Sequence, residues 1–202
     1  MTSFVAGDTD TSLVTDMERM FDDAEALVSA DLSTFDTAAV TSMAGMFNAT
    51  FALSSLDVSH FNTTSVTTMN EMFWYTHLSS LDLSSFSTPL VTDMSYMFAD
   101  TSLLTNLDIS NFNTAAVTDM SFMFRNAAAL TSLNLSHFNT SLVTNMAKMF
   151  NNATSLSSLT LTNWDVDQVT TSTSIFQGMT GTIYCNQGGS PGTGTIFGEN
   201  CN

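Results

Sequence analysis

The feature that most constrains this chain is a repeat of about 26 residues. Each unit opens on a valine and a threonine and continues with two methionines and a phenylalanine, in the pattern V-T-x-M-x-x-M-F. Self-similarity at a fixed period is typical of proteins in which each unit stacks on its neighbours to bury a continuous core. The spacing is 26 residues, except for one shorter unit of 25. The opening valines are Val14, Val40, Val66, Val91, Val117, Val143 and Val169.

The first half of each unit predicts a short helix. Its apolar residues follow one another at steps of three, three and one, which places them on one face of a helix. The threonine after the opening valine is a residue type that caps helix N-termini. Asp16, Asp93 and Asp119 follow this threonine in three units, where a carboxylate favours the positive end of the helix dipole.

The second half, L-x-x-L-x-L-S-x-F-x-T, predicts a short strand. Leu107 and Ile109 would point inward and Asp108 outward, the alternation of a half-buried strand. The residue missing from the 25-residue unit falls between Phe73 and Leu78, in the loop that joins the two halves. We therefore expect an α/β repeat solenoid similar to leucine-rich repeats, with one short parallel strand and one short helix per unit.

The repeat also divides the chain. Residues 1–13 form a polar lead-in, and residues 14–177 form the repeat region, with about six units and a degenerate last one. Residues 178–202 are rich in glycine and contain both cysteines. Because the terminal units of a stack have an open edge to cover, we expect this tail to be a C-terminal cap.

Methionine and phenylalanine recur at fixed positions of the repeat. Twelve of the 16 phenylalanines fall in two columns, and twelve of the 14 methionines fall in two others. A methionine stripe can be a soft-metal site or an adaptable groove. Occurrence once per unit, interleaved with phenylalanine, favours a stacked core instead.

The charge of the chain excludes some partners. With 19 acidic and 3 basic residues, the formal net charge is −16, so the chain lacks the cationic surface that nucleic acids and anionic membranes require. No apolar run reaches the ~18 residues of a membrane span, and we expect no membrane insertion. The first 13 residues have neither a basic start nor an apolar stretch, so they do not predict a signal peptide.

The sequence offers no catalytic constellation. His60, His77 and His137 do not cluster, and the many serines and threonines make a chance Ser–His–Asp grouping uninformative. We therefore expect no enzymatic activity and no cofactor.

Cys185 and Cys201 are the only cysteines, and both lie in the tail. A disulfide between them is one prediction, and two free thiols in a reducing compartment are the alternative. Five N-x-S/T sequons are also present, although residues that recur at fixed repeat positions create such sequons by accident. They begin at Asn48, Asn62, Asn134, Asn139 and Asn152.

Small polar side chains occupy the outward positions of the predicted strands. Aspartates recur in one column there, and in-register stacking would bring their like charges ~5 Å apart. Screening by solvent and salt is the favoured interpretation. Weak calcium binding at Asp57, Asp82 and Asp108 is the alternative. We predict that this surface, which we call the strand face, contacts the ligand; it comprises Ser55, Asp57, Ser59, Ser80, Asp82, Ser84, Asn106, Asp108 and Ser110.

Two segments carry a family resemblance. N-W-D-V-D-Q-V-T-T at Asn163–Thr171 and F-N-T-A-A-V-T-D-M-S-F-M-F at Phe112–Phe124 resemble the repeats of the BspA-like leucine-rich repeat surface proteins. The resemblance extends from Val14 to about Phe176. It implies a strand-plus-helix solenoid, an extracellular or cell-surface location, and adhesion to an extracellular protein or glycan.

Three functions are compatible with these observations. A non-enzymatic binding or adhesion module at the surface or outside the cell is the favoured one. A structural spacer that stacks end to end is the alternative. Ice binding through threonine ladders is disfavoured, because Thr37 and Thr41 lie on either side of a turn and not on one strand.

Overall fold

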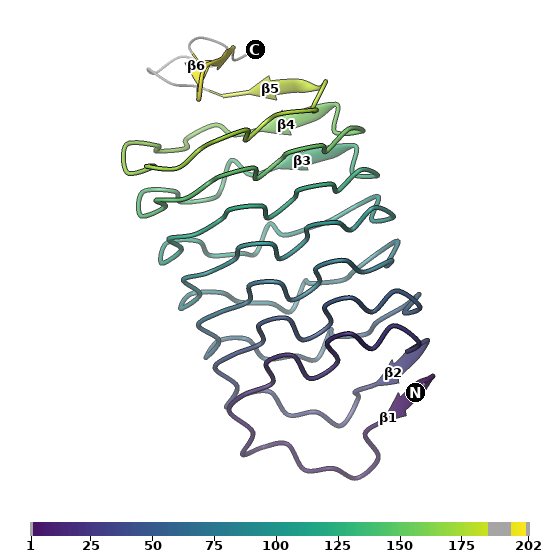
Figure 1. Ribbon diagram of the computed structural model, residues 1–202. Helices are drawn as coiled ribbons and strands as arrows, with labels where there is room; N and C mark the ends of the chain where they lie inside the picture. The colour runs from purple at the N-terminus through teal and green to yellow at the C-terminus, as the bar shows by residue number, and fades with distance from the viewer. Residues whose placement is uncertain (1, 186–194, 201–202) are drawn as a thin grey trace.

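The protein was analysed as a computed structural model that describes residues 2–185 and 195–200. The chain winds into a stack of flat layers, and each layer is one repeat unit (Figure 1). Parallel bridges join equivalent residues of successive layers, from Asp16 and Ser42 through to Asn145 and Thr171. We number the layers from the one that begins at Val14.

Strands are short and occur mainly at the two ends of the stack. β1 (Ser3–Val5) pairs in parallel with β2 (Ser29–Asp31). β3 (Ser132–Asn134), β4 (Ser158–Thr160) and β5 (Thr182–Tyr184) form a second parallel sheet in that order. β6 (Thr195–Ile196) and β7 (Glu199–Asn200) pair antiparallel. The predicted lead-in therefore contains a strand, and Phe4 on it packs edge-on against Phe21 at 5.0 Å.

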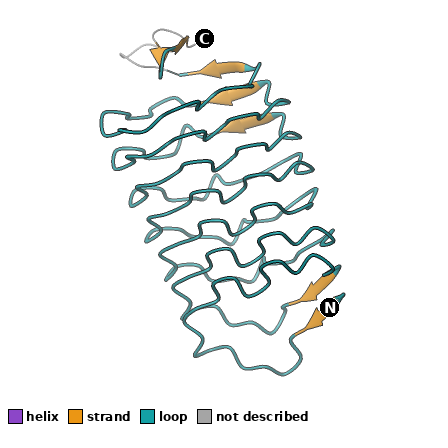
Figure 2. Ribbon diagram, in the orientation of Figure 1, coloured by secondary structure: helices purple, strands orange, loops and turns teal. Residues whose placement is uncertain are grey.

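The predicted helices are wrong. No helix occurs in the described residues, so the chain is not an α/β solenoid with one helix per unit (Figure 2). The V-T-x-M-x-x-M-F segments instead form successive turns whose backbone bonds alternate in direction. The N–H groups of Arg19 and Phe21 donate to the carbonyls of Ala44 and Met46 in the next layer, whereas the N–H of Asp22 donates back to Arg19.

This alternation requires left-handed backbone at two positions in each layer. A continuous α-helix needs negative φ at every residue, whereas φ at these positions lies between 54° and 83°. Most of the residues involved are not glycine, and each pays a steric cost for this conformation. The first column is Arg19, Gly45, Glu71, Tyr96, Phe122, Lys148 and Ser174, and the second is Asp23, Ala49, Tyr75, Asp100, Asn126, Asn152 and Gly178.

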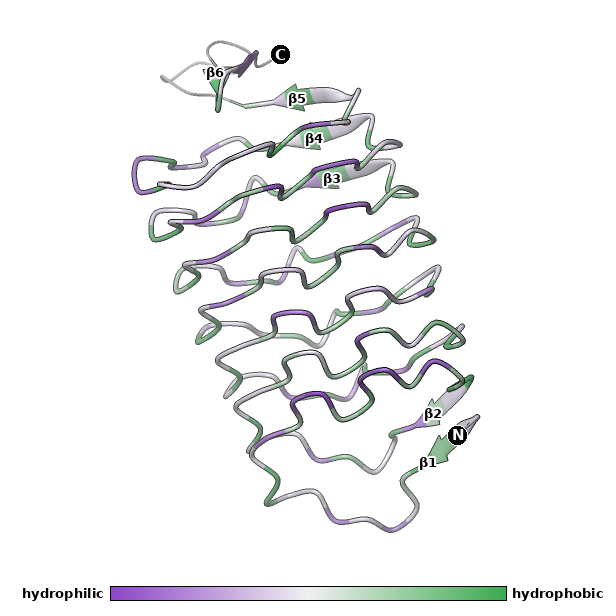
Figure 3. Ribbon diagram, viewed as in Figure 1, coloured by the Kyte–Doolittle hydropathy of each residue, from purple (hydrophilic) through white to green (hydrophobic). Residues whose placement is uncertain are grey.

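The core is made of the predicted methionine and phenylalanine columns. Met43, Met46 and Phe47, for example, are completely buried. Figure 3 shows hydrophobic and hydrophilic residues mixed along every layer, because side chains point alternately into the stack and out of it. The interpretation of the phenylalanine and methionine columns as core is confirmed, with the exception of Met20 in the first layer, which is 43% exposed.

Buried threonines tie the layers together. The hydroxyl of Thr63 donates to the carbonyl of Ser87 at 2.7 Å and accepts from the N–H of the same residue at 2.8 Å. One fully buried hydroxyl thus satisfies both backbone groups of a residue in the next layer. The same column of threonines donates a corresponding bond in six layers, at Thr11, Thr37, Thr63, Thr88, Thr114 and Thr140.

A second threonine column lies at the surface. These are the threonines expected to cap helices, and with the helices absent that role is wrong. The hydroxyl of Thr67 donates to the carbonyl of Thr41 in the preceding layer at 3.0 Å, beside the backbone N–H of Thr67, which donates to the same oxygen at 2.8 Å. The hydroxyl of Thr67 therefore only supplements a hydrogen bond that the backbone already forms between the two layers.

The C-terminal residues cover the last layer. Ile196 is buried in the core, and the ring of Phe197 lies 6.4 Å from that of Phe176. Gly181 lets β5 approach β4, because a Cβ there would lie 1.9 Å from the carbonyl oxygen of Leu156. The described part of the tail therefore packs on the last layer, and the C-terminal cap over residues 178–202 stays a prediction.

The two threonine columns predict different costs for the same substitution. Thr63→Val removes both bonds between the fully buried Thr63 hydroxyl and the backbone of the partly buried Ser87, so we expect a loss of about 1–3 kcal/mol in the free energy of unfolding. Thr67→Val is the control and should cost less than about 1 kcal/mol, since water and the backbone bond remain. Urea denaturation measures the free energy of unfolding of both variants. Equal losses would contradict the conclusion that the buried threonine column, and not the surface one, holds the layers together.

The left-handed positions predict a second contrast. Ala49 and Ala127 are both buried, but only Ala49 has a positive φ, of 54°. Ala127→Gly should destabilise by about 1 kcal/mol, because glycine adds backbone entropy to the unfolded chain. Ala49→Gly relieves the left-handed cost and should leave the melting temperature unchanged or raised. The idea fails if Ala49→Gly is the more destabilising of the two in thermal denaturation.

Candidate functional site

Aromatic residues outside the core columns gather on one face of the stack. The ring of Phe51 lies 5.0 Å from that of Tyr75, at an interplanar angle of 80°. Trp74 lies 5.3 Å from Tyr96, which stacks on Phe122 at 4.3 Å. These five residues come from the turn segments of layers 2 to 5, and we call them the aromatic face.

A groove of about 510 Å³ crosses this face. It passes over the first five layers, and its walls combine aromatic rings with charged and amide side chains. The lining residues are Asp23, Asn48, Ala49, Phe51, Trp74, Tyr75, Asp100 and Arg125.

The groove lies where the repeat is one residue short. The missing residue belongs to layer 3, in the loop just after Trp74 and Tyr75. In the layers on either side, the hydroxyls of Thr50 and Thr101 donate to backbone carbonyls within their own turn, at 2.8 and 2.7 Å. The corresponding Thr76 is only 1% exposed, and its hydroxyl has no partner. The shortened loop therefore breaks the local bonding pattern beside the groove.

All three basic residues of the chain lie on this side of the stack. Arg19 forms ion pairs with Asp22 and Glu71. The guanidinium of Arg125 lies 5.9 Å from the ring centre of Phe122, and the Nζ of Lys148 lies 5.5 Å from the same ring.

Asp100 anchors the groove. The indole Nε1 of Trp74 donates to one of its oxygens at 2.9 Å, and the amide of Asn126 donates to the other at 2.6 Å. The guanidinium of Arg125 lies 3.7 Å from the first of these oxygens. Burial is also the main reason why the pKa of the neighbouring Tyr96 is raised. The rings at the centre of the face are thus held in place by packing and by hydrogen bonds.

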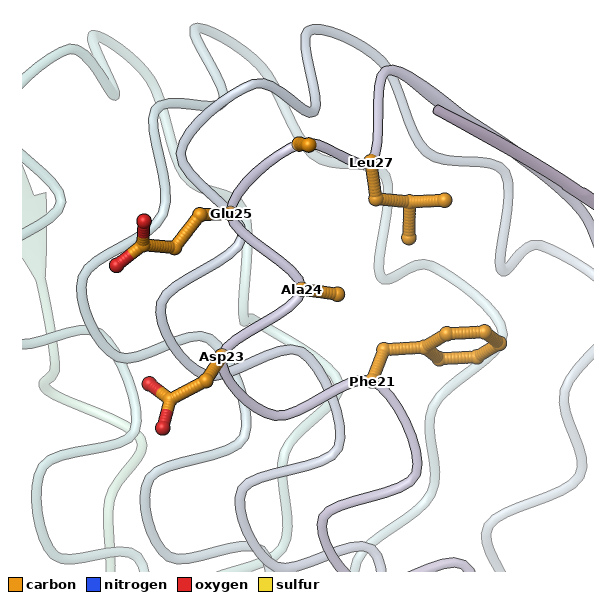
Figure 4. Close-up of a pocket in the computed structure, with 6 residues that line it drawn as sticks. Phe21, Asp23, Ala24, Glu25 and Leu27 are labelled. Atoms are coloured by element: carbon orange, nitrogen blue, oxygen red, sulfur yellow. The ribbon is translucent and has the colours of Figure 1, made fainter. Parts of the chain in front are cut away.

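A smaller hollow of about 270 Å³ lies in the first layer. Figure 4 shows Phe21 and Leu27 on one side of the backbone and Asp23 and Glu25 on the other. Its lining residues all belong to one turn of the first layer, and its one aromatic lining residue is Phe21 of the core column.

The strand face, which the sequence predicts to contact the ligand, is a different surface from the aromatic face. All nine residues of the strand face are exposed, but none is aromatic or basic. A shallow hollow of about 420 Å³ includes Asp108, Ser110 and His137, between layers 4 and 5. The structure therefore leaves the strand face accessible without giving it the side chains that usually dominate binding energy.

The aspartates of the strand face are each held within their own layer. The backbone N–H of the serine two residues later donates to the carboxylate, for example from Ser59 to Asp57 at 3.0 Å. Hydrogen bonds from these serines lower the pKa of Asp31, Asp57, Asp82 and Asp108 below the ordinary value of 3.8. The negative charges of Asp57 and Asp108 in the neighbouring layers act against this shift at Asp82, because they raise its pKa.

The calcium candidates are not gathered into one cluster, and weak calcium binding by them stays a prediction. In residues 2–185 and 195–200, no group of three or more His, Cys, Asp or Glu side chains lies close enough to hold a metal ion. Three aspartates of the column, Asp57, Asp82 and Asp108, lie in the part of the stack that lacks strands, whereas Asp31 ends β2 opposite Val5. Residues 32–131 contain no strand, whereas β3, β4 and β5 pair where Asn134, Thr160 and Tyr184 replace the aspartate. Repulsion between in-register carboxylates gives a physical reason for this difference.

Other predicted residues have structural surroundings. The Nε2 atoms of His60 and His137 lie 2.9 and 3.0 Å from backbone carbonyls of preceding layers. The amide of Asn48, one of the sequons, donates to Asp22 at 2.6 Å. Cys185 is buried, but Cys201 lies outside the described residues, so the disulfide stays a prediction.

The aromatic face is the feature that the sequence analysis missed, although a signal was present. Only four phenylalanines lie outside the two core columns, and two of them, Phe51 and Phe122, belong to this face. Trp74, Tyr75 and Tyr96 also occupy repeat positions that are mostly polar or small in other layers. Departures from the repeat, and not the repeat itself, would have located the site.

Comparison with known proteins assigns a family. A family described as "Mycoplasma protein of unknown function, DUF285" matches residues 4–103 and 75–184. The chain belongs to this family of repeat proteins, and the two overlapping matches reflect the repeats. No curated protein and no solved structure matches the chain. Within the described residues, no helix has the length and apolar character needed to cross a membrane.

The lowered pKa values predict how acid affects stability. A carboxyl group whose pKa is lower in the folded state stabilises the fold above its unfolded pKa, and this contribution is lost as the pH falls through the folded value. We therefore expect wild-type protein to lose stability as the pH falls below 3.8. Asn134 already accepts the corresponding bond from Ser136 at 3.1 Å, so asparagine preserves the turn. The variant D57N/D82N/D108N should lose less stability in urea titrations between pH 6 and pH 2, and superimposable pH profiles would contradict this.

Proposed function

We propose that this protein is a non-enzymatic binding module, displayed at the cell surface or outside the cell, and that the aromatic groove is its binding site. The observation that carries this proposal is the coincidence of three departures from the repeat at one place. These are the aromatic side chains outside the core columns, the basic residues of the chain and the shortened layer 3.

The composition of the groove supports a binding role. Trp, Tyr and Arg are the residue types enriched at energetic hot spots of interfaces, and Trp74, Tyr75 and Arg125 all line the groove. Contiguous apolar side chains on a surface mark interaction sites more often than scattered single ones do. Tyr75 remains 48% exposed. A purely structural stack has no need of such residues on its surface.

The surface location rests on the resemblance to BspA-like surface repeats, together with membership of the repeat family. The partner is an extracellular protein or a glycan. The backbone contacts of His60 and His137 support the non-enzymatic part of the proposal, because both rings already have structural partners.

End-to-end stacking as a spacer is the second candidate. The outer side of the first layer exposes an apolar side chain that is buried in later layers. Met20 is 43% exposed, whereas Met46 and Met72 in the same column are fully buried. Another layered chain could cover this end.

Binding to an array of extracellular matrix proteins and glycans tests the proposal. The groove variant F51L/Y75L should lose binding of at least one array member by about tenfold or more, as expected for loss of two anchor residues. The strand-face variant S80A/N106S should retain it. As a control for folding, both variants should have the same melting temperature as the wild-type protein.

Two outcomes would overturn the assignment. Loss of binding in S80A/N106S with full binding by F51L/Y75L would move the site to the strand face. Concentration-dependent oligomers in sedimentation, with no array member bound, would favour the spacer.

A further inference from the structure

Two rings of the groove form an open corner. Phe51 and Tyr75 meet edge to face, with centroids 5.0 Å apart and planes at 80°. The ring of His77 lies 5.6 Å from Phe51. Two nearly perpendicular rings can present their electron-rich surfaces to one small group at the same time. This arrangement suits a compact cation better than a flat sugar ring, which stacks on a single plane.

The charge around the corner also favours a cation. Asp23 and Asp100 line the groove, and its only lining cation, Arg125, lies beside Asp100. The net charge of −16 adds a long-range field that attracts positive ligands and repels anionic glycans. Both carboxylate oxygens of Asp100 and the indole N–H of Trp74 are already used within the groove. These groups are therefore already engaged and do not recognise the hydroxyls of a neutral sugar.

The same face already holds cations over an aromatic ring. Phe122 has the guanidinium of Arg125 at 5.9 Å and the ammonium of Lys148 at 5.5 Å. Among the described residues, no cation of the chain lies over Phe51 or Tyr75. The corner thus offers aromatic ring faces like that of Phe122, but a cation bound there would have to come from another molecule.

We propose that the corner formed by Phe51 and Tyr75 binds an arginine or lysine side chain from a partner polypeptide. The cation lies against the two rings, and Asp23 supplies the negative charge at the edge of the groove. This inference rests on the proposed function, since it specifies the ligand of the same groove. A volume of about 510 Å³ accommodates the side chain and its neighbours in an extended segment.

A capped glycine–serine peptide with four arginines is the probe, and the same peptide with citrulline in place of arginine is its neutral counterpart. Binding is followed by isothermal titration calorimetry at two salt concentrations. The variant F51L/Y75L keeps the net charge at −16 and removes both rings. Tyr184→Leu is the matched control, because Tyr184 is exposed to a similar extent, 42% against 48% for Tyr75, but lies on β5.

We expect the arginine peptide to bind wild type and Tyr184→Leu equally, and to bind F51L/Y75L about tenfold more weakly. The citrulline peptide should show no binding. Equal affinity of the arginine peptide for wild type and F51L/Y75L would overturn the inference, since only bulk charge would then be acting. Equal binding of both peptides by wild type would overturn it as well.

The melting temperature of F51L/Y75L shows whether this variant is folded. If the double variant is destabilised, the single variant Tyr75→Leu is used in its place. The outcome on the array separates this inference from the proposed function. If the arginine peptide fails but an array member still depends on Phe51 and Tyr75, only the ligand class is wrong. If no ligand depends on these residues, the proposed function fails too.

Discussion

The stacking of one phenylalanine per layer is the interaction on which the rest of the structure depends. Six successive ring pairs have centroid distances of 5.5–5.8 Å and interplanar angles of 3–9°. These distances exceed the ~4.8 Å between neighbouring strands, so the rings are displaced sideways as aromatic quadrupoles prefer. A ring that must meet its copy in the next layer allows only one register. Every other column of like residues follows from that register, and the column is Phe21, Phe47, Phe73, Phe98, Phe124, Phe150 and Phe176.

Because the register between layers is fixed, the backbone N–H groups can donate to the neighbouring layer and no helix is needed. The residue pattern that places Met17 and Phe21 on one helical face also places them on the inner side of alternating turns. The two structures differ in where the N–H groups donate, either four residues back or into the neighbouring layer. In an isolated unit the helix would be the arrangement that satisfies them within the unit, without water. In a stack, Phe21 donates to Met46, and this bond offsets the steric cost of left-handed residues such as Arg19.

The periodic part of the structure could therefore be predicted from the sequence, and the local geometry could not. The layer period, the buried Met43 and Phe47, and the inward direction of Leu133 on β3 all follow from repetition. The helix was wrong because hydrophobic spacing alone does not distinguish a helix from turns that repeat at the same positions. The role of Thr63 was also inaccessible, since a hydroxyl that binds the next layer requires the register of two backbones. The aromatic groove could not be read from the repeat, because Phe51 and Tyr75 depart from the repeat pattern whereas Asp57 and Asp82 recur in it.

Exceptions are informative in such a stack because the repeated positions already have a structural task. Substituting Phe47 or Thr63 disturbs the neighbouring layers, whereas positions on the outer side of the turns contact few core residues. Phe51 and Tyr75 occupy such positions, and the shortened layer 3 lies directly beside them. One deletion can open a groove there without shifting the core, because Phe73 and Leu78 on either side remain fully buried or nearly so. A layered fold thus confines the consequences of a change to one loop, and a binding site can arise on its surface while the phenylalanine column stays unbroken.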